Sequence, residues 1–321
     1  MIDVTAIGEL LIDFACQSTD VAGYPTMAAN PGGAPGNLLA ALNRYGCSTA
    51  FLAKVGDDAF GHLLVGTLEK AGIATDGILV DPTVFTTLAF VTLDETGDRH
   101  FSFARKPGAD TCLRFEELNL GLIDQCRDLH FGTLSLTNDP AKTATEKAVA
   151  YAKAQGKYIS FDPNLRKPLW PDMDAAREAI LWGLRQADIV KISDEETEFL
   201  WGCSAEEAAE KLHREFGVTL AFITLGPKGC YYSGNGFTGR VNTPSGIHPI
   251  DTTGAGDIFG GSVLSRILLL HKPLSEMGGE ELRHATAFAC CAASLSTQNL
   301  GGISGVCPLH EVEAKLAELE E

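Results

Sequence analysis

Apolar, strand-like runs alternate with longer amphipathic segments along most of this chain, and this alternation limits the fold more than any other feature. Such runs occur at residues 129–134, 158–161, 189–192 and 220–225, with helix-like stretches between them. Strands that alternate with helices form βαβ units, in which the strands are parallel and the helices cover the sheet. The sequence therefore predicts an α/β fold with a mainly parallel central sheet and helices on both faces.

Length and charge restrict the classes of function. The 321 residues, with a mass of 34.1 kDa, fit one large domain over residues 1–321. The formal net charge of −17, without a run of Lys or Arg, argues against a nucleic-acid partner. An anionic substrate would need a local cationic pocket in a protein of this charge.

The nine cysteines form no CxxC pair and match no His pattern of a zinc site. We therefore expect buried thiols in a reducing environment and no disulfide framework. The first 14 residues have a strand-like pattern without a basic leader, and no uncharged apolar run approaches the roughly 18 residues of a membrane span. These features predict a cytoplasmic protein without a membrane partner.

Residues 87–105 interrupt the alternation. Two strand-like runs, 87–93 and 99–105, flank Asp-Glu-Thr-Gly-Asp, so this segment is expected to form an antiparallel hairpin. The second run would place Phe101, Phe103 and Arg105 on one face. Together, segments near 12–30 and 86–106 are expected to form a small β lid on the α/β body. An edge hairpin whose Phe face packs on the core would show the same pattern.

The segment most informative about chemistry is Asp-Thr-Thr-Gly-Ala-Gly-Asp at residues 251–257, followed by the helical, apolar run 258–270. A helix start offers unpaired backbone N–H groups and the positive end of the helix dipole, so this turn can hold a phosphate. A carboxylate beside a phosphoryl group can accept the proton of an attacking hydroxyl, which makes Asp257 a candidate general base. Asp251 and Asp257 could also be ordinary turn and cap residues.

A second glycine cluster lies at residues 30–37 and leads into the helical run 38–45. The adjacent Gly32 and Gly33 allow the backbone to approach a ligand, and Asn37 offers an amide to hydroxyl groups. Asp13 closes the first strand-like run, where a carboxylate can accept hydrogen bonds from sugar hydroxyls. A capped Gly/Pro turn and a solvated loop Asp are the structural alternatives.

These motifs together resemble the ribokinase (PfkB) family of sugar kinases and, within it, the fructokinases. The resemblance covers nearly the whole chain. No Walker A motif is present, so a P-loop enzyme is excluded. Five segments carry the resemblance, in the family's order: Gly-Gly-Ala-Pro-Gly-Asn at 32–37, continuing to Gly61; Phe-Asp-Pro-Asn-Leu-Arg at 161–166; Lys-Ile-Ser-Asp-Glu-Glu at 191–196; Thr-Leu-Gly-Pro-Lys-Gly at 224–229; and the turn at 251–257.

The resemblance implies a ribokinase-like fold and ATP-dependent phosphorylation of a sugar hydroxymethyl group. Asp257 would be the base, and the N–H groups of Gly254, Ala255 and Gly256 would form an anion hole. The implied sugar contacts are Asp13, Gly32, Gly33, Asn37, Phe101, Phe103, Arg105 and Arg166. The implied ATP contacts are Lys191, Ser193, Glu196, Thr224, Gly226 and Gly229.

D-fructose, giving fructose 6-phosphate, is the favoured substrate. The alternatives are 2-keto-3-deoxygluconate, whose carboxylate Arg105 and Arg166 could recognise, and ribosides such as ribose or aminoimidazole riboside. A sugar sensor that has lost catalysis is the non-enzymatic alternative. The exposed edge of the lid hairpin suggests a homodimer formed through the lid.

The resemblance also implies Mg²⁺ with the ATP, and it allows K⁺. Glu196 would organise Mg²⁺ through water, whereas Asp251 and Thr253 correspond to the monovalent-cation site. Two departures from the family pattern bear on these sites. Ser193 replaces the Asn of Asn-x-x-Glu, and with Glu196 it also forms a capping-box pattern. Residues 301–304, Gly-Gly-Ile-Ser, replace Gly-Ala-Ile-Pro near the expected adenine pocket.

Overall fold

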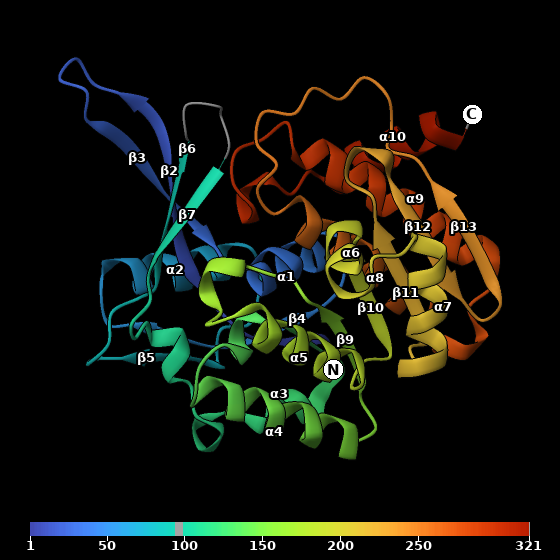
Figure 1. Ribbon diagram of the computed structural model, residues 1–321, viewed down its shortest axis with the longest axis horizontal. Helices are drawn as coiled ribbons and strands as arrows, with labels where there is room; N and C mark the ends of the chain where they lie inside the picture. Colours follow the sequence, from blue (N-terminus) through green and yellow to red (C-terminus); the bar gives the residue numbers. More distant parts are fainter. Residues whose placement is uncertain (94–98, 321) are drawn as a thin grey trace.

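Parallel strands form the centre of the molecule, which confirms the predicted α/β class (Figure 1). The computed structural model describes residues 1–93 and 99–320. Within these residues, the central sheet has the strand order β13-β12-β11-β10-β9-β8-β1-β4-β5. Neighbouring strands are parallel from β11 to β5, whereas β12 and β13 are antiparallel to their neighbours. The strands are β1 (Ile2–Ile7), β4 (Thr49–Gly56), β5 (Ile78–Asp81), β8 (Cys126–Gly132), β9 (Tyr158–Asp162), β10 (Ile189–Ser193), β11 (Leu220–Thr224), β12 (Cys230–Gly234) and β13 (Phe237–Val241).

Helices cover both faces of this sheet, and two hydrophobic cores result. Alternate residues of β11 face opposite cores: Leu220 and Phe222 belong to one cluster, Ala221 and Ile223 to the other. The first core is completed by α1 (Ala34–Arg44), α2 (Ala59–Lys70), α8 (Ala255–Leu268), α9 (Gly279–Ser296) and α10 (Leu309–Glu320). The second is completed by α3 (Leu120–Gln125), α4 (Ala141–Ala154), α5 (Met173–Leu184), α6 (Asp194–Trp201) and α7 (Ala205–Phe216).

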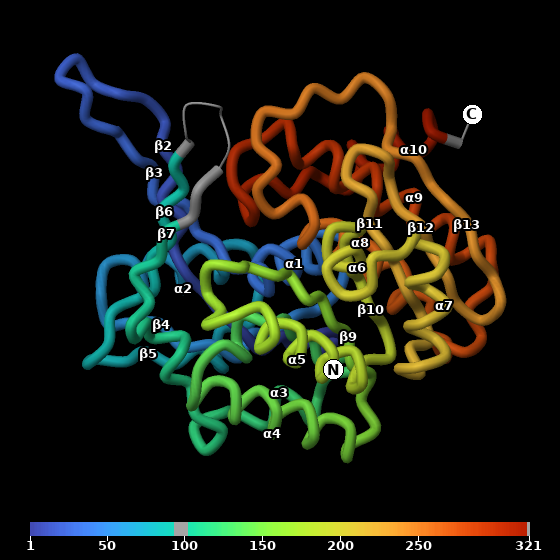
Figure 2. Tube along the Cα trace, in the orientation of Figure 1, coloured from blue at the N-terminus to red at the C-terminus, as the bar shows by residue number. Residues whose placement is uncertain are grey.

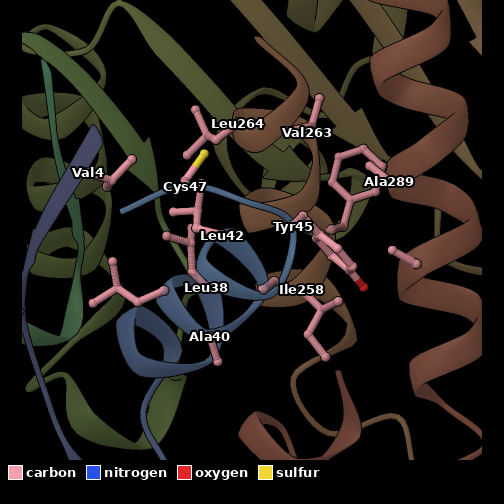
Figure 3. Packing of buried hydrophobic residues seen from close by; sticks show 14 of the residues in the cluster. Val4, Leu38, Ala40, Leu42, Tyr45, Cys47, Ile258, Val263, Leu264 and Ala289 are labelled. Atoms are coloured by element: carbon pink, nitrogen blue, oxygen red, sulfur yellow. The ribbon is translucent and has the colours of Figure 1, made fainter. Parts of the chain in front are cut away.

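The packing of α1 against α8 fixes the relative position of their first turns. Figure 3 shows Leu38 and Leu42 of α1 beside Ile258 and Leu264 of α8 in the first core. A Cβ atom on Gly261 would lie only 2.3 Å from the carbonyl oxygen of Leu38, so glycine allows the two backbones to approach closely. This close contact holds the first turns of α1 and α8 in a fixed relation to each other.

A second, four-stranded sheet projects from the body (Figures 1 and 2). Its order is β3-β2-β6-β7, with β2 and β6 parallel and both outer pairs antiparallel. It contains the segments that were expected to form the lid, apart from the turn at 94–98, which lies outside the described residues. The strands are β2 (Leu11–Thr19), β3 (Pro25–Gly32), β6 (Leu88–Leu93) and β7 (Arg99–Ala104).

Three expectations need correction or comment. The first 14 residues are not one strand, because the chain leaves the central sheet at Gly8 and enters the second sheet as β2, so Asp13 lies within a strand and does not close one. All nine cysteines are free, but only six are buried, because Cys16 is exposed on β2 and Cys112 and Cys203 are half-buried. In the part of the chain that the structure describes, no helix is both long and apolar enough to span a membrane.

Candidate active site

A cavity of about 710 Å³ lies between the second sheet and the carboxyl ends of the central strands. In open α/β sheets, ligands bind outside these strand ends. The wall contains residues that follow β1 and β9, the first turn of α1, the segment before α8, and parts of β2, β3 and β6. The predicted site residues in the wall are Asp13, Gly33, Asn37, Arg166, Asp251, Thr253, Gly254 and Asp257.

Asp257 lies in the first turn of α8, where its carboxylate is buried at the cavity wall. Its Oδ2 accepts a hydrogen bond from Asn37 Nδ2 (2.8 Å), and its Oδ1 accepts one from Asn164 Nδ2 (3.1 Å). Burial raises the pKa of Asp257 to about 6, and the charge of Asp162 acts in the same direction, while the Asn37 hydrogen bond opposes the rise. A carboxylate held in this way is ionised at neutral pH and is a stronger base than an ordinary Asp.

The turn before Asp257 requires glycine at position 254 and is closely packed at Gly256. Gly254 caps α8 with φ +75°, and a Cβ atom there would lie 2.8 Å from the Cα of Gly302. A Cβ atom on Gly256 would lie 3.0 Å from Nζ of Lys191. The turn therefore sits at a helix N-terminus, in close contact with a lysine, which is an arrangement suited to a phosphoryl group. The N–H of Ala255 donates to the Thr252 carbonyl at 3.3 Å.

On the opposite side of the cavity, Asp13 and the glycine loop are packed together. A Cβ atom on Gly32 would lie 2.1 Å from Oδ2 of Asp13, so only glycine leaves room for this carboxylate. Gly33 has φ +111°, and a Cβ atom there would lie 2.5 Å from the carbonyl oxygen of Glu9. Burial raises the pKa of Asp13 to about 6, although the charge of Arg166 opposes the rise.

The residues predicted to contact ATP do not line this cavity. They lie at the carboxyl ends of the neighbouring parallel strands β10 and β11, where Ser193 pairs with Thr224. Gly226 and Gly229 follow β11 with φ +55° and +94°. Sugar-side and nucleotide-side candidates thus occupy adjacent positions along one edge of the sheet.

Lys191 and Asp162 connect the two sides. Their side chains form an ion pair with a 3.0 Å separation between Nζ and Oδ2. Burial alone would lower the pKa of Lys191, but the charges of Asp162, Glu196 and Asp257 outweigh burial and raise it. Lys191 therefore stays cationic between the candidate base and the nucleotide side, where it can balance phosphate charge.

Ser193 and Glu196 form the capping box that their spacing predicts. Ser193 Oγ accepts from the Glu196 N–H (3.2 Å), and Glu196 Oε2 accepts from the Ser193 N–H (2.8 Å). Glu196 Oε1 also accepts from the N–H of Leu165 (2.8 Å), which ties α6 to the segment after β9. Each carboxylate oxygen retains acceptor capacity for a water molecule.

Asp251 joins two loops at the cavity. Its Oδ1 accepts from the N–H of Thr253 and its Oδ2 from the N–H of Gly301, both at 2.9 Å. Among the described residues, no group of three or more His, Cys, Asp or Glu side chains is placed to hold a metal ion. A cation at this loop would therefore depend on backbone and hydroxyl oxygens in addition to Asp251.

Arg105 is not where its predicted role requires it. It does not line the cavity, because its guanidinium is buried and donates to Asp110, Thr137 and the carbonyl of Leu134. The half-buried Phe103 on β7 also does not line the cavity. The side chain of Phe101 lies outside the part that the structure describes.

Two cavity residues were not recognised as candidates from the sequence. Asn164 holds Asp257, and its φ of +45° is a conformation that Asn tolerates better than most residues. Glu9 accepts from the N–H of Ala34 (3.0 Å), and burial raises the pKa of Glu9 to about 7. Both follow the carboxyl end of a parallel strand, which is the signal that could have identified them.

The chain is similar to carbohydrate kinases over most of its length. A profile of the pfkB family of carbohydrate kinases matches residues 1–308. Fructokinase-2 of Oryza sativa subsp. japonica is 42% identical over 307 residues, covering 94% of this chain and 89% of the relative. Fructokinase-2 of Zea mays is also 42% identical over 307 residues, covering 94% of this chain and 90% of the relative.

Solved structures agree with the sequence relatives. Fructokinase from Xylella fastidiosa with bound ATP has a TM-score of 0.87 and 29% identity, covering 99% of both chains. A double mutant of Vibrio cholerae fructokinase, with fructose, ADP and a potassium ion bound, has a TM-score of 0.86 and 30% identity, covering 98% of both. An E. coli protein in complex with ATP and Mg²⁺ has a TM-score of 0.87 and 29% identity, covering 99% of this chain and 100% of that one. The chain therefore belongs to the pfkB family of carbohydrate kinases.

Proposed function

We propose that this protein is a fructokinase, which transfers the γ-phosphoryl group of ATP to the terminal hydroxymethyl group of D-fructose. The observation that carries the proposal is the carboxylate of Asp257, buried at a helix N-terminus in the cavity wall and held by Asn37 and Asn164. Fructokinases from plants and bacteria are similar over nearly the whole chain, which supports the choice of substrate.

In the proposed reaction, Asp257 accepts the proton of the sugar hydroxyl as its oxygen attacks the γ-phosphorus. The new P–O bond forms while the bond to the β-phosphate oxygen breaks, and ADP leaves with that electron pair. Gly254 and Gly256 would place backbone N–H groups and the positive end of α8 beside the transferring group. The N–H of Ala255 would join them by exchanging its 3.3 Å hydrogen bond to the Thr252 carbonyl for a phosphoryl oxygen. Lys191, held by Asp162, would balance further negative charge.

Ions enter this proposal with the nucleotide. Glu196 would hold Mg²⁺ through water, since its two carboxylate oxygens each accept one backbone N–H and keep capacity for another donor. The Mg²⁺ would neutralise charge on the phosphate oxygens. Asp251 and Thr253 would hold K⁺ at the point where Asp251 links the turn before α8 to Gly301.

The charge of the cavity favours a neutral sugar over a sugar acid. Its wall contains four acidic side chains, those of Glu9, Asp13, Asp251 and Asp257, whereas Arg166 is the single Lys or Arg among its described residues. Arg105, the other residue considered for carboxylate recognition, is paired with Asp110. We therefore propose fructose ahead of 2-keto-3-deoxygluconate.

A coupled assay of ADP release with fructose, ribose, 2-keto-3-deoxygluconate and aminoimidazole riboside tests the proposal. We expect the highest kcat/KM with fructose, at least about tenfold above 2-keto-3-deoxygluconate, a difference of roughly 1.4 kcal/mol in transition-state stabilisation. A higher kcat/KM with 2-keto-3-deoxygluconate than with fructose would make the sugar acid the substrate. ADP release that does not depend on any sugar, or no release, would support a sensor instead.

A homodimer through the second sheet is a further part of the proposal. The turn between β2 and β3 exposes Val21 and Tyr24, and apolar side chains of this kind suit a contact with a second subunit. Light scattering coupled to gel filtration should give twice the mass of 34.1 kDa for the wild type. The mass of a single chain at micromolar concentration would contradict it.

A further inference from the structure

One buried carboxylate receives both ends of the β6–β7 hairpin. Thr87 immediately precedes β6 and Arg105 immediately follows β7. Thr87 Oγ1 donates to Oδ1 of Asp110, and Arg105 Nε donates to Oδ2 of the same residue at 2.8 Å. Thr87, Arg105 and Asp110 are all buried, with 0%, 7% and 4% of their surface exposed. The two hydrogen bonds therefore join the roots of the hairpin to a single side chain.

Asp110 itself belongs to the body of the protein. It lies in the short 3-10 helix η1 (Ala109–Cys112), and Lys54 of β4 donates to the carbonyl of Cys112 at 3.2 Å. Lys54 also pairs with Glu117 at 2.6 Å. Because β4 belongs to the nine-stranded central sheet, this lysine fixes η1 to the main sheet.

The contact around Asp110 is closely packed. A Cβ atom on Gly108 would lie 1.7 Å from Oγ1 of Thr87, so only glycine leaves room for this hydroxyl. Arg105 extends the connection with hydrogen bonds to Thr137 Oγ1 (2.7 Å) and to the Leu134 carbonyl (2.9 Å). Leu134 lines the cavity, so the same guanidinium touches the hairpin root and the cavity wall.

The roots of the hairpin also determine where β2 lies. The N–H of Ile12 donates to the Thr87 carbonyl at 3.1 Å, next to the parallel pairing of β2 with β6. Asp13 of β2 and Val91 of β6 both line the cavity. A displacement of Thr87 would therefore move two walls of the sugar cavity together.

We propose that Asp110 is a positioning residue for sugar binding, which holds the second sheet in the place that a bound sugar requires. The inference rests on the proposed function for its substrate. Loss of the Asp110 contacts would lower the population of the binding-competent arrangement, and apparent affinity falls in proportion to that population. Once sugar is bound the arrangement is restored, so turnover at saturation is little changed.

Kinetics of four variants test the role. Asp110→Asn removes one of the two acceptor oxygens, and Thr87→Val removes the hydroxyl donor. Two variants serve as controls. Thr87→Ser keeps the hydroxyl, and Asp188→Asn alters a carboxylate that accepts the Ile159 N–H far from the cavity. We expect the first two to raise KM for fructose by about tenfold, with kcat and the KM for ATP within about threefold of wild type. Thr87→Ser and Asp188→Asn should match the wild type. An unchanged KM for fructose in Thr87→Val, or an equal rise in both KM values, would overturn the proposal.

Hydrogen exchange without sugar gives a readout that does not need activity. Thr87→Val should accelerate exchange in β2 and β6 and leave β10 unchanged, whereas Thr87→Ser should match the wild type throughout. Uniform acceleration, or none, would contradict the role of Asp110. If the wild type failed to phosphorylate fructose, the proposed function would fall, while this exchange pattern would still decide the positioning role.

Discussion

At the scale of single residues, the proposed chemistry depends on how Asp257 is held. The side-chain amides of Asn37 and Asn164 each donate a hydrogen bond to one of its two carboxylate oxygens, and the residue is buried. The amides orient the carboxylate without neutralising its charge. Lys191 lies close enough to favour the ionised form but is paired with Asp162.

This environment predicts an acid limit to activity. A base works only when ionised, and the pKa of Asp257 is raised to about 6, so activity should be lost as the pH falls through that value. Asp13, whose pKa is also raised to about 6, should steepen the decline if it binds sugar as a carboxylate. We expect log kcat/KM for fructose to be level between about pH 7 and pH 8 and to fall with a slope of at least about one below pH 6. A profile that stays level to about pH 4.5 would rule out a base with this pKa.

Asp128 offers a prediction about stability. It is fully buried, accepts from Ser160 Oγ, and its Oδ1 has no hydrogen-bond partner within the described residues. Burial raises the pKa of Asp128 to about 8, so the folded state keeps a proton that the unfolded chain releases, and stability falls as the pH rises toward 8. Asp128→Asn lacks this titration, so its Tm relative to wild type should rise by a few degrees between about pH 5 and pH 7. An equal Tm difference at both pH values would contradict the assignment.

At the scale of elements, a substitution in the glycine turn before α8 should lower activity mainly through clashes with neighbouring residues and less through backbone strain. Gly254 and Gly246 both have φ +75°, but a Cβ atom on Gly254 would press on Gly302 and lie 3.1 Å from Nδ2 of Asn37, whereas Gly246 has no atom within 4 Å. Alanine at either position carries the same left-handed cost of about 1–2 kcal/mol. We expect Gly254→Ala to lower kcat/KM at least about tenfold and Gly246→Ala to leave it within about twofold. Equal losses of kcat/KM in the two variants would show that backbone strain alone accounts for the effect.

The elements themselves were largely predictable. The apolar runs at 158–161, 189–192 and 220–225 correspond to β9, β10 and β11, because buried parallel strands are short and mostly apolar. The break at Gly8 was missed because only three residues separate β1 from β2, and the two strands differ chiefly in their pairing partners. That separation depends on β6, some 75 residues later, which local patterns do not encode.

At the scale of the whole molecule, the cavity joins segments from β1 to the loop before α10. Asn37 and Asp257 are 220 residues apart in the chain, yet Nδ2 of Asn37 lies 2.8 Å from Oδ2 of Asp257. Motif order made both of them candidate site residues, but no local rule places the amide of Asn164 on Asp257 or turns Arg105 away from the cavity. The contact of Asn164 with Asp257 depends on the approach of β9 to α8. The orientation of Arg105 depends on its pairing with Asp110, which sequence spacing does not predict.

The most direct test compares two aspartates that each lie in the first turn of a helix. Asp257 lies in the first turn of α8 at the cavity, and Asp174 lies exposed in the first turn of α5. ADP release with saturating fructose and ATP should fall at least about a hundredfold in Asp257→Asn and stay within about twofold of wild type in Asp174→Asn. Near wild-type turnover in Asp257→Asn, with the variant folded, would contradict the central claim that Asp257 is the base of a sugar kinase.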